Sequence, residues 1–593
     1  MYASCKNKEL RRSDQFLLPV SKPFLTERKY DIYPSFKISD DQILTGFETL
    51  AERIQGSEKV TIDGYGGVFF DIFRRRLDEI LRNKGFSVSW ITTSDFYKPE
   101  EQIDRLTAPF LGGDDPLFGK RTTLNLEDFF IADRLKSLTP DPGYDINILT
   151  GPGAALAGWN GLLIYIDIPK SEIQYRSRAG SVSNLGFTEP SDPKTMYKSF
   201  YFVDWVVLNR HKENILASAD IFVDGQRPEL PVWMEGTTLR ETLRNMSQSV
   251  FRTRPWFEPG TWGGTWIKDN IPGLNKNVPN YAWSFELITP ENGLIIESSS
   301  LLCEVSFDCL MYLHAEDILG NYYPQSGKNF PIRFDFLDTF DGGNLSLQCH
   351  PRPQYIKENF GEILTQEETY YILDTKDDAV VFLGFCDDFK PDNFGRDLED
   401  NYDTGKPFNP DKYILKHHVK KHDLLLVPYG TIHGSGKNNL VLEISTTPYI
   451  FTFKMYDWQR PDLDGKPRPL NIRRGMENLF FDRKGDYAKA RLIAKPELLG
   501  EGSDWKLFRL PTHETHSYDV HRYHFRSVID INTENTCLVM SLTEGQSISL
   551  ETKNGFRKTF FYAETFVIPA AAQTVRIINN SSSEAILVKA FMK

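Results

Sequence analysis

The chain has 593 residues, of which 40% are hydrophobic and 25% charged, and its formal net charge is −12 at pH 7. This length exceeds what one hydrophobic core supports, so two to four domains are expected. The acidic balance provides no general basic surface for nucleic acid or anionic lipid, and no run of about 18 apolar residues predicts a membrane span. Six widely spaced cysteines and an N-terminus without an apolar signal segment indicate a reducing compartment. We therefore expect a cytoplasmic protein with neither nucleic acid nor membrane as a partner.

The first 250 residues predict an α/β domain. EKVTIDGYGG at 58–67 indicates a strand that runs into glycines, and FFDIFRRRLDEILRNKG at 69–85 an amphipathic helix that Gly85 ends. FSVSWITTSDFY at 86–97 predicts the next strand, which completes a βαβ unit. GLLIYIDIP and ADIFVDGQ, further along the chain, predict buried strands that end in acidic residues.

This pattern, with SDFYKP at 94–99, resembles the uridine kinase and phosphoribulokinase group of P-loop proteins. The resemblance implies a kinase-like domain with a parallel sheet over residues 1–250. A working phosphate loop needs G-x-x-x-x-G-K-[ST], in which the lysine reaches phosphate and the hydroxyl reaches Mg²⁺. Neither residue follows the glycines at 64–67, so we predict a degenerate loop with steric glycines and no kinase chemistry. Weak binding of a nucleotide or a partner stays open, and Asp63 and Asp95 are the residues to test.

Residues 345–373 carry the strongest chemical signal. LSLQCHP alternates, so Ser346, Gln348 and His350 face one side of a strand that Pro351 ends. Glu368 opens a second β-rich run, EETYYIL, and HDLLLVPYGTIHG leads through a turn to His433. Such a mixed nitrogen and oxygen set suits a divalent metal such as zinc. A glutamine and a histidine two apart on a strand are also common as a plain polar face.

The order WGG, QCHP, YYIL, GTIHG, LEIS, YDWQR resembles type I phosphomannose isomerases (mannose-6-phosphate isomerases), a family of zinc-dependent cupins, over about residues 255–593. NYAWSFELI and NGLIIES resemble the family's first cupin strands. The resemblance implies a multidomain chain in which two β jelly-roll (cupin) domains follow the kinase-like one. The first, at 251–500, would bind metal; the second, at 501–593, would not, because ETFVIPAAAQ ends in alanines and glutamine where LLLVPYGTIH ends in histidine.

The resemblance also implies a metal-dependent aldose–ketose isomerase that interconverts mannose 6-phosphate and fructose 6-phosphate, or a related sugar, through an enediol. It assigns Lys454 and Glu443 to catalysis. The implied substrate-binding residues are Ser346, Gln366 and Asp335, and the implied metal ligands are Gln348, His350, Glu368 and His433.

The substrate pocket departs from the family pattern. Gln366 and Asp335 stand where the family usually has lysines, and Lys454 where it usually has arginine. An unpaired Asp335 would repel a phosphate, although Arg333, Arg352 or Lys357 would compensate if they faced the pocket. The alternative function is a non-catalytic carbohydrate-binding or sensing cupin protein. In the same half, we expect a polar loop at 387–412, a short helix within 408–423 and solvated histidines at 417, 418 and 422.

Overall fold

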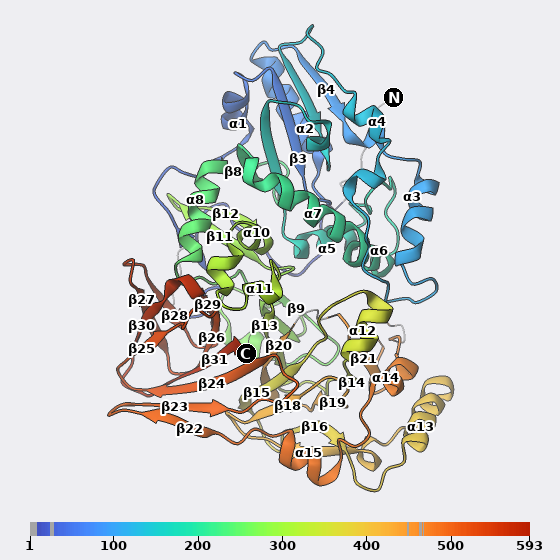
Figure 1. The fold of residues 1–593 in the computed structure, drawn as a ribbon, viewed down its shortest axis with the longest axis vertical. Coiled ribbons are helices and arrows are strands. Elements are labelled where there is room, and N and C mark those ends of the chain that lie inside the picture. Colours follow the sequence, from blue (N-terminus) through green and yellow to red (C-terminus); the bar gives the residue numbers. More distant parts are fainter. Residues whose placement is uncertain (1–8, 24–28, 447–449, 462–464, 466–467) are drawn as a thin grey trace. The chain divides into compact units, whose positions relative to one another are not determined.

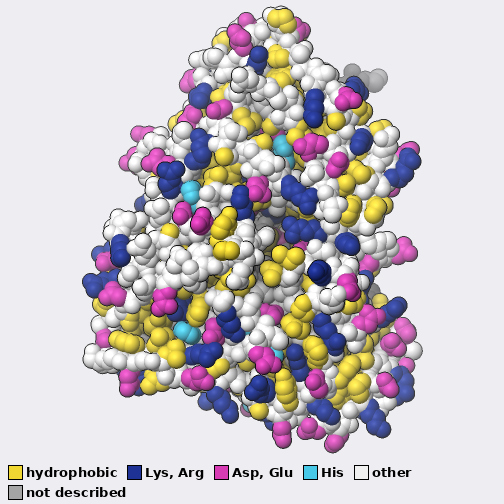
Figure 2. Space-filling model, viewed as in Figure 1, with side chains coloured by type: hydrophobic (Ala, Val, Ile, Leu, Met, Phe, Trp, Pro, Cys, Tyr) yellow, Lys and Arg dark blue, Asp and Glu magenta, His cyan; other side chains and the backbone are white. Residues whose placement is uncertain are grey.

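The computed structural model describes residues 9–23, 29–446, 450–461, 465 and 468–593 (Figure 1). The chain divides into two compact units. Unit 1 consists of Met1–Phe24, Tyr33–Met246 and Pro290–His314, and unit 2 of Leu25–Ile32, Ser247–Thr289 and Ala315–Lys593. No helix within the described ranges has the length and apolar character to span a bilayer. On the face drawn in Figure 2, basic and acidic side chains are interspersed.

Unit 1 is built on a seven-stranded sheet whose five consecutive strands β7, β6, β3, β5 and β4 run parallel. The predicted parallel α/β sheet is therefore present. Asp63, Asp167 and Asp224 stand at the carboxyl ends of their strands, as the sequence predicts. In sheet order the strands are β2 (Leu44–Thr45), β8 (Val232–Glu235), β7 (Ile221–Asp224), β6 (Leu162–Asp167), β3 (Lys59–Gly64), β5 (Ile146–Thr150) and β4 (Val88–Thr92).

Helices accompany this sheet. Helix α2 buries Phe73, Leu77 and Leu81, which are four residues apart and therefore share one helical face against the core of the unit. Gly85, with φ +92°, follows the helix as predicted. The helices are α1 (Phe47–Ile54), α2 (Phe70–Asn83), α3 (Glu100–Thr107), α4 (Ala132–Lys136), α5 (Lys170–Arg178), α6 (Pro193–Ser199), α7 (Trp205–Ile215) and α8 (Gly236–Ser247).

Residues 290–314 return to unit 1 from a distant part of the sequence. They supply β11 (Gly293–Ser298) and β12 (Leu301–Ser306), which form a three-stranded sheet with β1 (Ser35–Lys37). Helix α10 (Phe307–Leu319) follows and leaves helical geometry at His314, where unit 1 ends. NGLIIES is thus a strand of unit 1, although its sequence resembles a cupin strand. The division at residues 250 and 500 stays a prediction.

Unit 2 begins with two antiparallel sheets that share a core. Leu337, Tyr370 and Val441 of one sheet lie in the same buried cluster as Val381 and Leu383 of the other. One sheet consists of β18 (Leu424–Val427), β15 (Glu368–Thr375), β20 (Asn439–Thr446), β13 (Ile332–Asp338), β10 (Trp283–Leu287) and β9 (Trp256–Glu258). The other consists of β17 (Ile414–His418), β16 (Val380–Phe385), β19 (His433–Ser435), β14 (Leu347–Cys349) and β21 (Phe453–Tyr456).

Two local expectations in this region are wrong. The polar stretch at 387–412 contains α13, whose buried Phe394 and Leu398 are four residues apart. The short helix expected within 408–423 is strand β17, preceded by one 3-10 turn. The other helices of unit 2 are α9 (Trp266–Asn270), α11 (Tyr323–Ser326), α12 (Pro353–Phe360), α13 (Pro391–Thr404), α14 (Ile472–Asn478) and α15 (Gly485–Arg491).

A second antiparallel sandwich ends the chain, as predicted for the β-rich residues after 500. Alternate residues of the two sheets, such as Met540 and Ile548, form one buried cluster. The larger sheet consists of β22 (Glu497–Glu501), β23 (Trp505–Leu510), β24 (Tyr518–Phe525), β31 (Ala585–Met592), β26 (Leu538–Glu544) and β29 (Thr565–Ile568). The smaller consists of β25 (Val528–Asn532), β30 (Thr574–Asn579), β27 (Ser547–Thr552) and β28 (Arg557–Phe561).

Candidate metal centre

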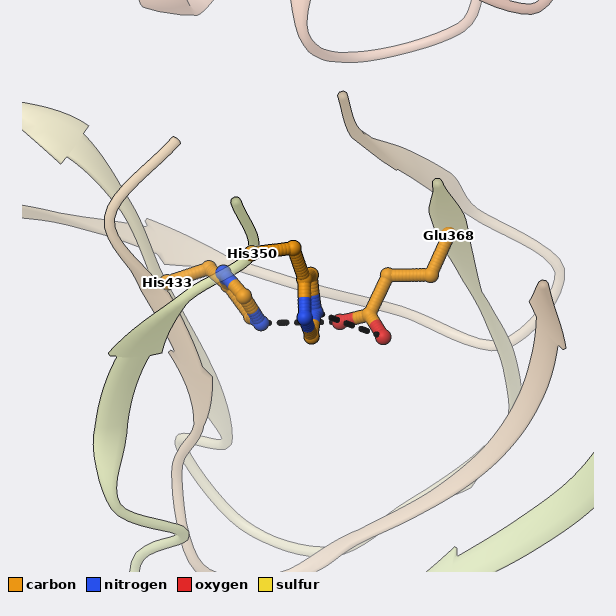
Figure 3. A group of neighbouring side chains, drawn as sticks. All are labelled: His350, Glu368 and His433. Atoms are coloured by element: carbon orange, nitrogen blue, oxygen red, sulfur yellow. Dashed lines mark ion pairs between the residues drawn. The ribbon is translucent and has the colours of Figure 1, made fainter. Parts of the chain in front are cut away.

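Two histidines and a glutamate converge inside the first sandwich of unit 2. His350 directly follows β14, His433 opens β19 and Glu368 opens β15, so the two sheets contribute from opposite sides. All three side chains are fully buried. One ligand atom from each lies within 4.8 Å of the others, and Figure 3 shows both imidazoles directed toward the carboxylate. Long-range strand pairing therefore brings together three residues that are up to 83 positions apart in the sequence.

Each imidazole is held through its Nδ1 atom. His350 Nδ1 lies 3.2 Å from the carbonyl oxygen of Phe451, and His433 Nδ1 lies 2.9 Å from that of Thr431. A carbonyl only accepts hydrogen bonds, so Nδ1 is the protonated nitrogen of each ring and Nε2 carries the lone pair in the neutral imidazole. A backbone carbonyl that fixes the tautomer in this way is the usual partner of a metal-ligating histidine.

The two Nε2 atoms meet the carboxylate of Glu368. His433 Nε2 lies 2.8 Å from Oε1, and His350 Nε2 lies 3.1 Å from Oε2. Neither His350 Nε2 nor Glu368 Oε1 makes a hydrogen bond of good geometry to a described residue. At this distance in an apolar interior, a nitrogen lone pair and a carboxylate oxygen repel each other unless a proton or a cation lies between them. The donor set, two imidazoles and a carboxylate, is one that zinc takes.

Burial and charge act in opposite directions on Glu368. Burial alone would raise the pKa of its carboxyl group, but His350 and His433 in their protonated forms outweigh burial and hold that pKa well below its ordinary value. Glu368 is therefore ionised at neutral pH, which is the form that binds a cation.

Gln348 stands beside the three. It pairs with His433 across β14 and β19, and its Nε2 atom is 3.4 Å from His433 Nε2. Ser346 Oγ is 3.1 Å from Gln348 Oε1. The side-chain amide of Gln348 can be turned by 180°, which exchanges its Oε1 and Nε2 atoms. Its hydrogen bond to Ser346 is kept, because a hydroxyl both donates and accepts. The Oε1 atom then faces His433 Nε2 and the point between the two imidazoles. The chain thus offers a fourth, oxygen ligand.

A buried charge network lies on the neighbouring strands β13 and β20. Arg333 makes two hydrogen bonds to Asp335, of 3.0 and 3.2 Å, and an ion pair of 2.8 Å with Glu443. Gln366 donates to Glu368 at 2.8 Å and to Glu443 at 3.3 Å, which joins this network to the candidate metal centre. Asp335 is therefore paired with Arg333, so it is not the unpaired carboxylate that would repel a phosphate.

Burial dominates the ionisation of these acids. It raises the pKa of Asp335, and it raises that of Glu443 well above the ordinary value even though Arg333 opposes the shift. With all groups ionised, the one arginine and three carboxylates would carry a net charge of −2, but the raised pKa values of Asp335 and Glu443 favour a smaller negative charge.

The remaining predicted residue, Lys454, lies on β21 directly opposite Gln348. Residues opposite each other on neighbouring strands project to the same face of a sheet, so Lys454 and Gln348 share a face. Arg352, which we had considered as a compensating cation, instead donates to the backbone carbonyls of Asn478 and Leu479.

Tyr370 is a residue of this region to which the sequence analysis gave no role. Its ring lies edge-on to His433 at 6.0 Å, and burial together with Glu368 and Glu443 raises its pKa well above the ordinary value. Its hydroxyl therefore stays protonated at neutral pH. The signal was present in the alternation, because Tyr370 is two residues after Glu368 on the same strand.

His417, expected to be solvated, is buried, and its Nε2 atom lies 2.9 Å from the carbonyl oxygen of Leu383. It lies on β17 outside the cluster formed by His350, Glu368 and His433.

The glycine loop of unit 1 is packed with side chains. Arg176 donates to the carbonyl oxygen of Gly67 at 2.8 Å and stacks over Phe69 at 4.2 Å. A Cβ atom on Gly66 would lie 2.9 Å from Leu208, so these glycines serve close packing. Asp63 accepts hydrogen bonds from backbone amides, including that of Gly153, and contacts His211 Nε2 at 2.8 Å. These contacts support the steric interpretation of the loop; the kinase-like assignment stays a prediction.

Comparison with known proteins gives two separate results. A domain of unknown function, DUF8485, matches residues 46–248, within the N-terminal half. The chain is homologous to mannose-6-phosphate isomerases over about 38% of its length. Mannose-6-phosphate isomerase ManA of Bacillus subtilis is 27% identical over 224 residues, and the alignment spans 66% of that relative's length. The mannose-6-phosphate isomerase of Streptococcus mutans is 28% identical over 232 residues, which are 39% of this chain and 68% of that one.

Among solved structures, the crystal structure of the mannose 6-phosphate isomerase from Bacillus subtilis aligns with a TM-score of 0.48 and 19% sequence identity. That alignment covers 58% of this chain and 99% of the other.

Proposed function

We propose that unit 2 is a metal-dependent aldose–ketose isomerase of the mannose-6-phosphate isomerase type. The observation that carries this proposal is the buried His350–Glu368–His433 cluster, whose two fixed tautomers direct lone pairs at an ionised carboxylate. The homology to isomerases of this name supports the reaction class.

In this proposal Gln348, His350, Glu368 and His433 hold a divalent metal, most simply zinc. A bound metal of this kind polarises a sugar oxygen and orients the substrate. Glu443 and Lys454 exchange the proton that moves between neighbouring sugar carbons. Burial raises the pKa of Glu443 well above its ordinary value although Arg333 opposes the shift, and this direction suits the acid role.

Ser346, Gln366 and Asp335 complete the substrate side. Gln366 links Glu368 to Glu443 and thereby fixes the distance between the metal carboxylate and the acid. Asp335 is fully buried and paired with Arg333, so it acts on the sugar by positioning that guanidinium. Mannose 6-phosphate is the substrate to test first.

The experiment is a coupled assay of mannose 6-phosphate conversion together with metal analysis of the full-length protein. We expect turnover and about one divalent metal per chain. His433→Ala should lose both, whereas His417→Ala, which removes a buried histidine outside the cluster, should keep both. Stoichiometric metal in His433→Ala would refute the ligand assignment.

One observation favours a second function. Arg333 is engaged by two carboxylates, Asp335 and Glu443, which reduces the positive charge available to a phosphate. A carbohydrate-binding or sensing protein with a retained metal centre would fit this arrangement. Binding of sugar to the metal-loaded protein without any turnover would favour that function over the isomerase.

A further inference from the structure

A pocket of about 540 Å³ lies on the C-terminal sandwich. Its volume is in the range of about 300–1,000 Å³ that small-molecule sites occupy. None of the residues of the candidate metal centre lines it. Four of its seven lining residues are carboxamides, which are Gln248, Asn532, Asn535 and Gln573. Thr533 adds one hydroxyl, and two alanines add a small apolar surface.

Two turns that are hydrogen-bonded to each other form the wall of this pocket. Asn532 is the last residue of β25, the turn after this strand carries Asn535, and the turn after β29 carries Gln573. The Thr533 amide donates to the carbonyl oxygen of Gln573 at 2.7 Å, and the Thr533 hydroxyl donates to that of Ala570 at 2.9 Å. Gln573 has φ +60° and ψ −71°, a conformation that side-chain-bearing residues rarely adopt and that persists only where the surroundings fix it. The wall is therefore held in place before any ligand binds.

The lining selects a class of ligand by its chemistry. No lining residue is charged, so a phosphate, carboxylate or ammonium group would enter without a partner. Three of the carboxamides are partly engaged within the protein. Asn532 Oδ1 accepts from the Glu534 amide, Asn535 Nδ2 donates to Asn321, and Lys553 Nζ donates to Gln573 Oε1 at 3.4 Å. An apolar ligand would displace water from their remaining donors and acceptors. Each carboxamide offers both donors and an acceptor, as neighbouring hydroxyl groups also do, and the alanine methyl groups can contact C–H bonds. A neutral polyhydroxyl compound can bond to the remaining donors and acceptors.

The first sandwich has a turn of the same kind. There β18 ends before Pro428, and the turn that follows leads to His433; here β29 ends before Pro569, and the turn leads to Gln573. The same type of turn that supplies a histidine to the candidate metal centre supplies a neutral amide to the second pocket.

We propose that this pocket binds a neutral sugar at a site separate from the metal centre. The ligand is either a free hexose or the terminal unit of a longer glycan, since both present the same hydroxyl groups. The inference does not depend on the isomerase function, because it concerns a different pocket and a different chemistry.

The test is saturation-transfer NMR on the full-length His433→Ala protein, in which binding at the metal centre is removed. The probes are D-mannose, D-fructose, D-glucose and a neutral mannose disaccharide. We expect at least one to bind, and preference for the disaccharide would identify a glycan end. Mannose 6-phosphate should compete at least tenfold more weakly than the best neutral probe.

The double variant Gln248→Leu/Gln573→Leu should weaken this binding at least tenfold. Both side chains are exposed, so the fold should be kept, which an unchanged melting temperature would verify. Gln546→Leu, an exposed glutamine of the same sandwich that does not line the pocket, is the matched control and should bind as before. Absence of binding by every neutral probe, or binding unchanged in the double variant, would overturn the proposal. Loss of isomerase activity in His433→Ala does not bear on the neutral-sugar site, because that site is separate from the metal centre.

Discussion

His433 and Glu368 approach within 2.8 Å through Nε2 and Oε1, while the other nitrogen of the same ring is 2.9 Å from the carbonyl oxygen of Thr431. The backbone contact assigns the ring proton to Nδ1, so a neutral His433 has no proton to give to Glu368. Either a second proton or a cation must therefore screen this pair. Metal binding should displace protons here and stabilise the folded protein.

Zinc should raise the melting temperature of metal-stripped protein. At a free zinc concentration about 100 times the dissociation constant, the expected stabilisation is about 2.7 kcal/mol. Glu368→Gln should abolish the response, because it removes the charge that both imidazoles face. His417→Ala should respond as the unmodified protein does. A zinc response that survives in Glu368→Gln would place the ion elsewhere.

Asp335→Asn should destabilise unit 2. Asp335 is fully buried and Arg333 is 6% exposed, so the substitution deprives a buried arginine charge of one of its carboxylate partners. Breaking a buried pair by changing one partner costs about 3–5 kcal/mol. The measurement is the urea concentration at the midpoint of the transition in which unit 2 unfolds. A midpoint equal to that of the unmodified protein would contradict the expectation.

The matched control for this prediction replaces both partners. Arg333→Met/Asp335→Leu removes these two charges together, and the loss of Arg333 raises the pKa of Glu443 further, so that this carboxyl group can be buried in its neutral form. The double variant should therefore cost less than Asp335→Asn alone, because apolar side chains of similar volume need no counter-charge. If the double variant is the less stable of the two, Arg333 has a further partner that outweighs Asp335.

Alternation along one strand was enough to predict that Ser346, Gln348 and His350 lie together, whereas Glu368 and His433 were added by the family resemblance. Gln348 and Ser346 share a face, and His350 lies just beyond them, as expected for residues two apart. The pairing of Asp335 with Arg333 was not predicted, although they too are two apart on one strand. Their contact with Glu443 depends on the register between β13 and β20, which is set by residues more than 100 positions apart.

The composition of residues 387–412 conceals the amphipathic helix α13. The stretch that contains α13 has so many acidic residues, glycines and prolines that it resembled a loop, yet Phe394 and Leu398 have helical spacing. The membership of Gly293–Ser298 in unit 1 could not be predicted, for another reason. A segment that returns to unit 1 after about 40 residues in unit 2 leaves no trace in local sequence, because its partners lie far away in the chain.

Asp308→Ala should destabilise unit 1. Lys170 Nζ lies 2.8 Å from one carboxylate oxygen of Asp308, and Lys212 Nζ forms an ion pair of 2.6 Å with the other. Both lysines are almost completely buried, and Asp167 is the second carboxylate on Lys212. Loss of one buried partner should cost about 3–5 kcal/mol. Limited proteolysis of unit 1 in the full-length variant measures the effect.

Two comparisons sharpen this prediction. Asp530→Ala breaks an exposed pair with Arg576 and should cost less than about 1 kcal/mol. A fragment of residues 1–250 lacks Asp308, β11 and β12, so it should be more sensitive to protease than unit 1 within the whole chain. A protease-resistant 1–250 fragment would show that residues 290–314 are dispensable.

Lys589 should make stability depend on pH in the alkaline range. Burial lowers its pKa to about 8, and Glu534 and Asp519 only partly oppose the shift. The side chain lies over the rings of Tyr523 on β24 and Phe591 on β31. An unfolded lysine has a pKa of about 10.4, so between about pH 8 and pH 10 the unfolded state binds more protons than the folded state. The free energy of unfolding should therefore rise with pH across this window.

Lys589→Met removes this contribution and keeps most of the side-chain volume. The difference in melting temperature between the variant and the unmodified protein should be largest near neutral pH, where the unmodified protein must bury a charged ammonium group. It should shrink as the pH rises toward about 10, because the lysine is then neutral in both states. The effects of other titrating groups on the melting temperature are the same in both proteins and cancel in this difference. A difference that stays constant with pH would show that Lys589 keeps its ordinary pKa and that its effect comes from packing alone.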